Sequence, residues 1–261
     1  MLRLLPNTRI KQTRPGLAGL AISWWRAAYA LDVSWTIESA DHPLGARVAF
    51  GFLRRDSGPR RETLRWAAAL TLPVFERLPL IDRVRPVRLD ALVAARLLCL
   101  FATAATSFGC SPQLALDWLS ENGLAGELSP REREHIASAA HPEPYAVGCV
   151  EAIWVLCWAV SMCDQLRVED AHAPDDLITK MPSMLQPGAA AAFVGSVRLR
   201  QDAELLGKLD QAYYLHWACV DAALHRRPVP LGLDLLRVEW RRRALEWMFA
   251  SEAWDDVSLD T

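Results

Sequence analysis

The C-terminal stretch from Tyr213 to Thr261 constrains this chain more than any other. It contains two tryptophan-rich segments separated by a proline-rich turn, and it closes with an acidic tail. In both segments apolar residues recur every three or four positions, which indicates amphipathic helices that must bury one face against other elements. Two such helices in succession predict an α-helical domain whose core they share.

The first of these helices is predicted from about Asp202 to His225. His216 lies in the middle of its apolar face, which is an unusual place for a side chain that can carry charge. The simpler interpretation is a core histidine with one hydrogen-bond partner, and the alternative is a general base or a metal ligand. The apolar face is expected to hold Leu206, Leu209, Ala212, Tyr213, His216, Trp217, Val220 and Leu224, opposite Lys208, Asp210, Gln211 and Asp221.

The second helix is predicted from about Leu233 or Asp234 to Phe249, after a turn that contains Pro228, Pro230 and Gly232. Two pairs of charged residues, Glu239–Arg243 and Arg242–Glu246, stand four positions apart, where side chains on one helix meet. We interpret them as weak ion pairs on a solvated face. The alternative is a basic cluster that binds an anion or the acidic tail.

The tail from Trp254 to Thr261 carries large apolar residues that a disordered chain end has little use for. We therefore predict that it docks on the two final helices, with Trp254 in an apolar slot. Two adjacent aspartates are too few ligands for a metal ion. The prediction pairs Asp255 or Asp256 with His216, Arg241, Arg242 or Arg243.

The strings YYLHWAC, RALEW and WDDVSLDT occur in this order at the end of the chain, and EAIWVLCW precedes them. As a set they resemble the bacterial family catalogued as domain of unknown function 4272, over roughly Val84 to Thr261. The resemblance implies a fold but no reaction. The matching positions are Tyr213, His216, Trp217, Arg241, Ala244, Leu245, Trp247, Trp254, Asp255, Asp256, Asp260 and Thr261.

The composition limits the cellular setting and the partners. The net charge of -2 gives no sign of a nucleic-acid surface. The six cysteines form no CxxC pair, and no signal peptide is visible, so we predict a cytoplasmic protein with reduced thiols. The stretch from Tyr145 to Cys163 is the closest to a membrane span, but it is short and contains Glu151, so a buried helix and no membrane are predicted.

The predicted fold is mainly α: a compact domain of about seven helices over residues 84–261, with a smaller N-terminal extension over residues 1–83. Alternating apolar residues between Val33 and Phe52 indicate a β-hairpin in that extension, and a helix follows from about Arg60 to Leu72. Prolines after this helix place the boundary near Arg83.

Helix boundary signals recur through the larger part. An apolar helix is predicted from Leu89 to Phe108, with Arg96 as its one charge in mid-helix. Ser111 with Pro112 indicates the start of a helix that ends near Asn122, and Ser129 with Glu132 forms a capping box. The charged residues 164–176 are interpreted as a solvated loop before a helix from about Asp175 to Met181, and a cation site there is the alternative.

No common catalytic motif occurs, and no cofactor or metal site is predicted. We expect a protein-interaction or neutralising, immunity-like protein without catalysis, whose partner is another protein. The alternative is an enzyme or small-ligand binder with a tryptophan-lined pocket and Glu151 and His216 as an acid/base pair. A buried Glu151 requires a partner, and we expect that partner to be His216 or an arginine of the last helix. An exposed patch of Trp24, Trp25 and Trp35 would favour the first class, and an open pocket that reaches His216 would favour the second. The candidate binding residues are Tyr213, His216, Trp217, Arg241, Arg242, Trp254, Asp255 and Asp256.

Overall fold

The computed structural model describes residues 58–75, 78–81, 86–138 and 144–260. Within these ranges the chain forms helices and loops and contains no strand, so the mainly α prediction is confirmed. The hairpin predicted between Val33 and Phe52 and the patch of Trp24, Trp25 and Trp35 lie outside the described residues.

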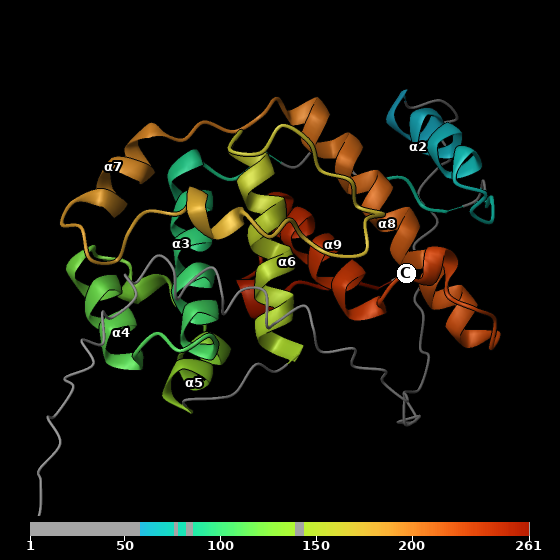
Figure 1. The fold of residues 1–261 in the computed structure, drawn as a ribbon. Helices are drawn as coiled ribbons and strands as arrows, with labels where there is room; N and C mark the ends of the chain where they lie inside the picture. The colour runs from blue at the N-terminus through green and yellow to red at the C-terminus, as the bar shows by residue number, and fades with distance from the viewer. Residues whose placement is uncertain (1–57, 76–77, 82–85, 139–143, 261) are drawn as a thin grey trace, which may run out of the picture.

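Five helices pack side by side in a row (Figure 1). The order across the row is α3 (Asp90–Ser107), α6 (Pro144–Ala159), α9 (Leu235–Phe249), α8 (Asp202–Leu224) and α2 (Gly58–Ala69). A helix inside such a row has neighbours on two sides, so its apolar residues need not be confined to one stripe. This explains why the sequence of α6 is apolar all round.

Helix α6 approaches α9 closely because residue 148 is a glycine. A Cβ atom built on Gly148 would lie 2.2 Å from the indole of Trp240 on α9. Helix α6 ends in a Schellman motif, in which the Met162 N–H donates to the Cys157 carbonyl over 2.8 Å. Ser161 takes the left-handed conformation there, with φ of 63°.

Three shorter helices pack against α3: α4 (Pro112–Glu121), α5 (Pro130–Ala137) and α7 (Ala189–Ser196). The 3₁₀ turn η1 (Ala125–Glu127) joins α4 to α5. The predicted capping box is present at α5, because the Glu132 N–H donates to the Ser129 hydroxyl while the Ser129 N–H donates to the Glu132 carboxylate. The capping signals at Ser111 and Ser129 therefore predicted the first residues of α4 and α5 correctly.

The predicted helix from Asp175 to Met181 is wrong. Only the 3₁₀ turn η2 (Leu177–Lys180) forms there. Met181 precedes Pro182 and has an extended backbone with ψ of 148°, because the proline ring disfavours the helical conformation of the residue before it. The turn η3 (Pro230–Gly232) separates α8 from α9, and η4 (Trp254–Asp256) lies in the tail.

Two residues of α8 lie on the opposite side from the prediction. Asp210, expected in solvent, is buried because the Arg60 guanidinium of α2 pairs with it at 2.7 Å. Leu224, expected in the core, is the last residue of the helix and is 74% exposed. Helix α2 lies before the predicted boundary at Arg83, yet it packs on α8 and adds Ala67 to the common core.

Among the described residues, α3 is the helix long and apolar enough to cross a membrane by length and composition. The same helix lies at one end of the central row, and 78% of its apolar window is buried inside the protein. Burial in a helical core accounts for this composition equally well.

Candidate functional site

Helix α9 carries two consecutive buried arginines that point to different neighbours. Arg241 reaches α6, where its Nε donates to Oε2 of Glu151 over 2.8 Å. Its Nη1 donates to the carbonyls of Val168 and Asp170 over 2.8 and 2.5 Å. The Arg241 guanidinium also lies over the Trp154 ring, 4.9 Å from its centroid. Arg241 thus joins α6, α9 and the loop after α6.

Glu151 is fully buried, and its carboxylate has a second arginine partner. Arg237 Nη1 lies 2.6 Å from Oε1 of Glu151, and the backbone N–H of Ala173 donates to the same oxygen over 3.3 Å. A buried carboxylate requires partners of this kind, because desolvation is costly for a charge that has none. The charged loop that the sequence analysis placed in solvent is therefore held against the core at Val168, Asp170 and Ala173.

Arg242 faces α8 and contacts His216. Its Nη1 donates to Nδ1 of His216 over 2.8 Å. Because a guanidinium has no acceptor, Nδ1 must be unprotonated, and the imidazole is neutral in this arrangement. Burial, together with the nearby charge of Arg242, lowers the pKa of His216 to about 4. His216 is thus a buried, neutral hydrogen-bond acceptor.

The same guanidinium binds the chain end. Arg242 Nη1 donates to the carbonyl of Leu259 over 2.9 Å, and Nη2 donates to the carbonyl of Asp260 over 3.0 Å. Its central carbon lies 4.6 Å from the centroid of the Tyr213 ring, and Glu246 is its carboxylate partner at 3.2 Å. The prediction that the tail docks on α8 and α9 is confirmed, although backbone carbonyls rather than aspartate carboxylates meet the arginine.

Trp254 fills the apolar slot that was predicted for it and is only 2% exposed. Its ring lies 6.2 Å from that of Trp240 and 5.7 Å from that of Trp247, measured between centroids. Arg243 also reaches the tail through a long hydrogen bond of 3.4 Å to the Trp254 carbonyl. The two tryptophans of α9 therefore form the slot.

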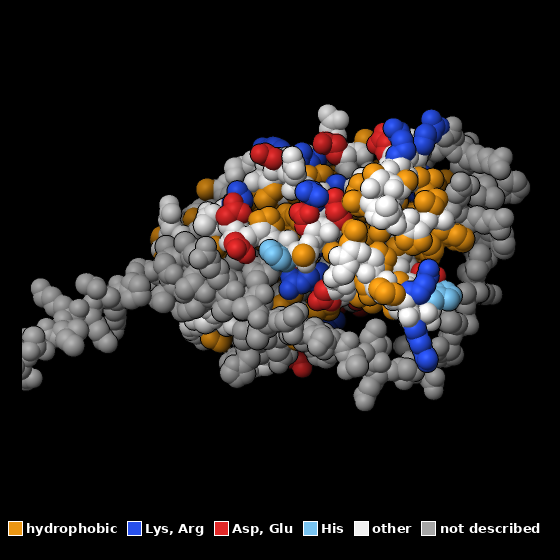
Figure 2. All heavy atoms as spheres, turned by 45° about the vertical axis from the view of Figure 1, so that its right-hand side comes forward, with side chains coloured by type: hydrophobic (Ala, Val, Ile, Leu, Met, Phe, Trp, Pro, Cys, Tyr) orange, Lys and Arg blue, Asp and Glu red, His pale blue; other side chains and the backbone are white. Residues whose placement is uncertain are grey.

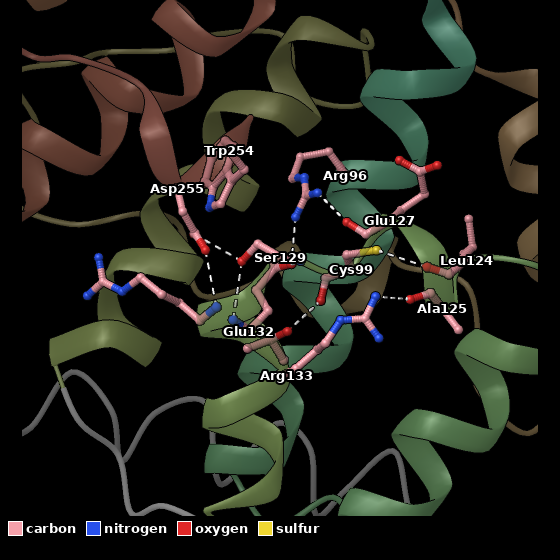
Figure 3. A network of polar contacts seen from close by, with 12 residues as sticks. Arg96, Cys99, Leu124, Ala125, Glu127, Ser129, Glu132, Arg133, Trp254 and Asp255 are labelled. Atoms are coloured by element: carbon pink, nitrogen blue, oxygen red, sulfur yellow. Dashed lines mark hydrogen bonds and ion pairs between the residues drawn. The ribbon is translucent and has the colours of Figure 1, made fainter. Parts of the chain in front are cut away.

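Asp255 binds α5, which contradicts the predicted pairing with His216 or an arginine of α9. Its carboxylate accepts from the Ser129 hydroxyl over 3.0 Å and from the Arg131 backbone N–H over 3.1 Å (Figure 3). A carboxylate is favourable there because the first backbone N–H groups of a helix have no partner inside the helix and carry partial positive charge. Asp256 is exposed to solvent.

Sequence reasoning missed a buried ion pair beside this contact, between Arg96 of α3 and Glu132 of α5. Arg96 Nη1 lies 2.6 Å from Oε2 of Glu132, and Arg96 also donates to the Glu127 carbonyl (Figure 3). Burial raises the pKa of Glu132, and the ion pair with Arg96 acts against this shift. The lone arginine of an apolar helix and the capping-box glutamate were the available signals, since each required a buried partner.

Residues 60–257 match the family described as "Domain of unknown function (DUF4272)". The chain belongs to this family. No curated protein and no solved structure matches it. The family match begins inside α2, earlier than the Val84 that the sequence resemblance suggested, in agreement with the packing of α2 on α8.

In this DUF4272 member the two residues of the predicted acid/base pair contact different arginines: Glu151 contacts Arg237 and Arg241, and His216 contacts Arg242. The described residues contain no group of three or more His, Cys, Asp or Glu side chains that could hold a metal ion. Cavities of ≈ 380 and ≈ 400 Å³ lie along α8, and neither is lined by Glu151 or His216. A catalytic role for the pair stays a prediction that this geometry does not favour.

Proposed function

We propose that the chain is a non-catalytic protein-interaction domain that binds an apolar partner segment carrying a carboxylate. The binding surface would be the "α8 groove", the ≈ 380 Å³ cavity lined by Thr71, Pro73, Ala218, Ala222, Arg227, Pro228 and Pro230. The observation that carries the proposal is the gathering of exposed apolar side chains around this groove. An immunity-like, neutralising role would use the same surface.

Large exposed apolar side chains follow two of the lining residues in sequence. Phe75 is 42% exposed and Leu231 50%, and they lie two and one positions after the lining residues Pro73 and Pro230. Figure 2 shows hydrophobic side chains gathered on the face that includes the C-terminal part of α8, with basic and histidine side chains at the edge. Contiguous exposed apolar surface with a polar rim is typical of protein-binding sites.

One wall of the α8 groove is held in place before any partner arrives. The Tyr214 hydroxyl donates to the Pro73 carbonyl over 2.9 Å and accepts from the Phe75 N–H over 2.6 Å. The Phe75 ring stacks on Trp217 with 5.2 Å between centroids. A preformed wall favours binding, because less conformational freedom is lost when the partner docks.

The rim of the groove is positively charged, which sets the chemistry of the partner. Arg226 and Arg227 follow the end of α8, and His225 is exposed beside them. Arg227 and His225 both pair with Asp221, whereas Arg226 makes no ion pair among the described residues. Charge complementarity therefore favours an apolar segment with an Asp or Glu close to its anchoring residue.

A random peptide library displayed on phage tests this proposal with the full chain as target. We expect the enriched peptides to combine a large apolar residue with Asp or Glu. Their affinity should fall at least about tenfold for Leu231→Asp and for Arg226→Glu, a loss of roughly 1.4 kcal/mol. The matched control is Leu185→Asp, which changes a leucine that is 57% exposed outside the groove and should leave affinity unchanged. Enriched peptides that bind Leu231→Asp as well as they bind the wild type would overturn the proposal.

A further inference from the structure

A second cavity, of ≈ 400 Å³, lies between α2 and the first half of α8, two helices that pack side by side (Figure 1). Trp158, near the end of α6, also lines it, and we call it the α2–α8 cavity. None of its lining residues lines the α8 groove, so the two sites are independent of each other. Pockets for small molecules typically measure about 300–1,000 Å³, so this cavity is large enough for a compact organic ligand.

Two arginines hold the walls of the cavity in place. Arg60 of α2 pairs with Asp210 of α8 at 2.7 Å, and each of them is adjacent in sequence to a lining residue. Arg200 Nε donates to the Trp158 carbonyl over 2.8 Å, and Arg200 Nη1 pairs with Glu204 at 3.6 Å. The cavity is therefore formed before a ligand arrives, which reduces the conformational freedom that binding removes.

Gly207 leaves space open in this cavity. It lies in the interior of α8, where glycine is less favourable than alanine because it loses more backbone freedom on folding. A Cβ atom built on Gly207 would meet no packing partner within 4 Å among the described residues, whereas one on Gly148 would lie 2.2 Å from Trp240. Close packing of helices therefore explains Gly148 but not Gly207. A ligand in the cavity explains why position 207 has no side chain.

Two polar side chains of the cavity have unused hydrogen-bonding capacity. Thr63 on α2 is 1% exposed, and its hydroxyl has no hydrogen-bond partner among the described residues. Buried hydroxyls without a partner are uncommon, because their desolvation is then not compensated. Lys208 on α8 is half-buried and donates to the Gln211 side-chain oxygen over 2.7 Å, and a lysine ammonium has further N–H donors to offer. A ligand carboxylate can accept hydrogen bonds from both side chains.

The acidic residues of the cavity distinguish a simple anion from a zwitterion. Glu204 is paired with Arg200, whereas Glu62 on α2 is exposed and forms no ion pair in the described part of the chain. A ligand that carried only a carboxylate would bring a second negative charge into a cavity that Glu62 lines. An ammonium group on the same ligand balances this charge, so charge complementarity favours a zwitterion.

We propose that the α2–α8 cavity binds a free α-amino acid with an apolar side chain. Lys208 and Thr63 donate hydrogen bonds to its carboxylate, and Glu62 pairs with its ammonium group. Charge-assisted hydrogen bonds of this kind are shorter and stronger than neutral ones. The apolar side chain of the ligand occupies the open space at Gly207, beside Trp158.

Isothermal titration calorimetry on the full chain tests the ligand class, with L-leucine, L-methionine and L-phenylalanine as probes. We expect at least one of them to bind, with one equivalent per chain. The tightest probe is then compared with its analogues that lack the ammonium or the carboxylate, which are isocaproate and isopentylamine in the case of L-leucine. Each analogue should bind at least about tenfold more weakly, because it lacks one charge-assisted contact. An analogue that binds as tightly as its amino acid overturns the proposal, and so does the failure of all three amino acids to bind.

Gly207→Leu locates the bound amino acid. The leucine side chain fills the cavity and should abolish binding. Leucine also has a higher helix propensity than glycine, so the melting temperature should not fall. Unchanged affinity in this variant overturns the proposal, because the amino acid is then bound elsewhere.

Two further variants test the carboxylate contacts. Thr63→Val and Lys208→Met should each weaken binding by about tenfold. Thr63→Val should keep the melting temperature of the wild type, because it removes a buried hydroxyl that has no partner among the described residues. Lys180→Met, at a lysine that does not line the cavity, is the matched control and should bind the amino acid like the wild type. Equal weakening by Lys180→Met and Lys208→Met shows a general effect of charge and contradicts a specific site.

Discussion

Arg241 and Arg242 are neighbours in sequence and are almost equally buried, at 1% and 3% exposed, yet they sit in different kinds of environment. Arg241 has a fully buried carboxylate partner, Glu151, and connects α9 to α6. The partners of Arg242 are the neutral imidazole of His216, two backbone carbonyls of the tail and the partly exposed carboxylate of Glu246. The charge of Arg241 is therefore neutralised inside the core, whereas two of the hydrogen bonds of Arg242 form only when the chain end is docked.

This difference teaches how one helix serves two interfaces. Successive residues of a helix point about 100° apart, so Arg241 and Arg242 cannot face the same neighbour. The Arg241 side joins α9 to α6 and to the loop that follows α6. The Arg242 side is covered only when the tail docks on it. A change at the C-terminus should therefore destabilise this side first.

The largest expected effect comes from deleting residues 254–261. Losing a buried tryptophan typically costs about 3–5 kcal/mol, and Asp255 also caps α5. Since 1 kcal/mol shifts the midpoint by roughly 2–4 °C in a chain of this size, we expect the melting temperature to fall by about 6–20 °C. Thermal unfolding followed by circular dichroism measures the change.

Hydrogen exchange on the truncated chain sharpens the comparison. Amides of α8 and α9 near His216 and Arg242 should lose protection first, while the loop that Arg241 holds at Val168 and Asp170 should keep it relative to the rest of the core. Asp256→Asn, a change at an exposed residue of the tail, is the control and should melt like the wild type. Superimposable melting curves for the full and truncated chains would show that the tail contributes nothing.

A somewhat smaller effect is expected from Glu151→Gln. The variant leaves Arg241 buried without a charged partner, and breaking a buried ion pair in this way typically costs about 3–5 kcal/mol. Denaturant unfolding gives the free energy. The double variant Glu151→Gln with Arg241→Gln should recover part of the loss, because the fully buried charge of Arg241 is then removed, while Arg237 keeps Asp234 as a carboxylate partner at 3.7 Å.

Glu246→Gln is the matched control on the Arg242 side. The Glu246 side chain is 24% exposed, so its pair with Arg242 should contribute less than about 1 kcal/mol. If Glu246→Gln costs as much as Glu151→Gln, the two arginines are equivalent and the comparison fails.

The sequence predicted the helices well and their side-chain partners poorly. Apolar periodicity located α8 and α9, and the capping box located the start of α5, because these signals are local. The same apolar periodicity placed Arg242 on a solvated face. It could not show that α8 and the tail cover this face, since that depends on which helices pack side by side.

Charged residues within apolar helices indicated buried ion pairs, but sequence reasoning identified only some of the partners. Arg96 and Glu151 each interrupt an apolar helix, and each required a partner on physical grounds. For Glu151 the partner was expected to be His216 or an arginine of the last helix, and the arginines are the observed partners. For Asp255 the predicted pairing was wrong, because its carboxylate binds the Ser129 hydroxyl and a backbone N–H at the start of α5, and a backbone donor leaves no signal in the sequence.

The third prediction concerns pH and isolates the Arg242 side. The pKa of His216 is about 4 in the folded chain, against roughly 6.5 in an unfolded one. Between these values the unfolded chain binds more protons, so stability is fully present above about pH 6.5 and is lost as the pH falls toward 4. For a side chain that is 6% exposed, the shift corresponds to about 3 kcal/mol across this window.

Replacing the imidazole by a neutral amide, His216→Gln, removes this titration while keeping an acceptor for Arg242. The difference in unfolding free energy between wild type and variant should therefore shrink by about 3 kcal/mol from pH 7 to pH 4. Taking the difference cancels the carboxylates, including Glu132, whose raised pKa gives a slope of opposite sign. A constant difference across the range would mean that His216 titrates alike in both states, and Arg242 would then not hold it neutral.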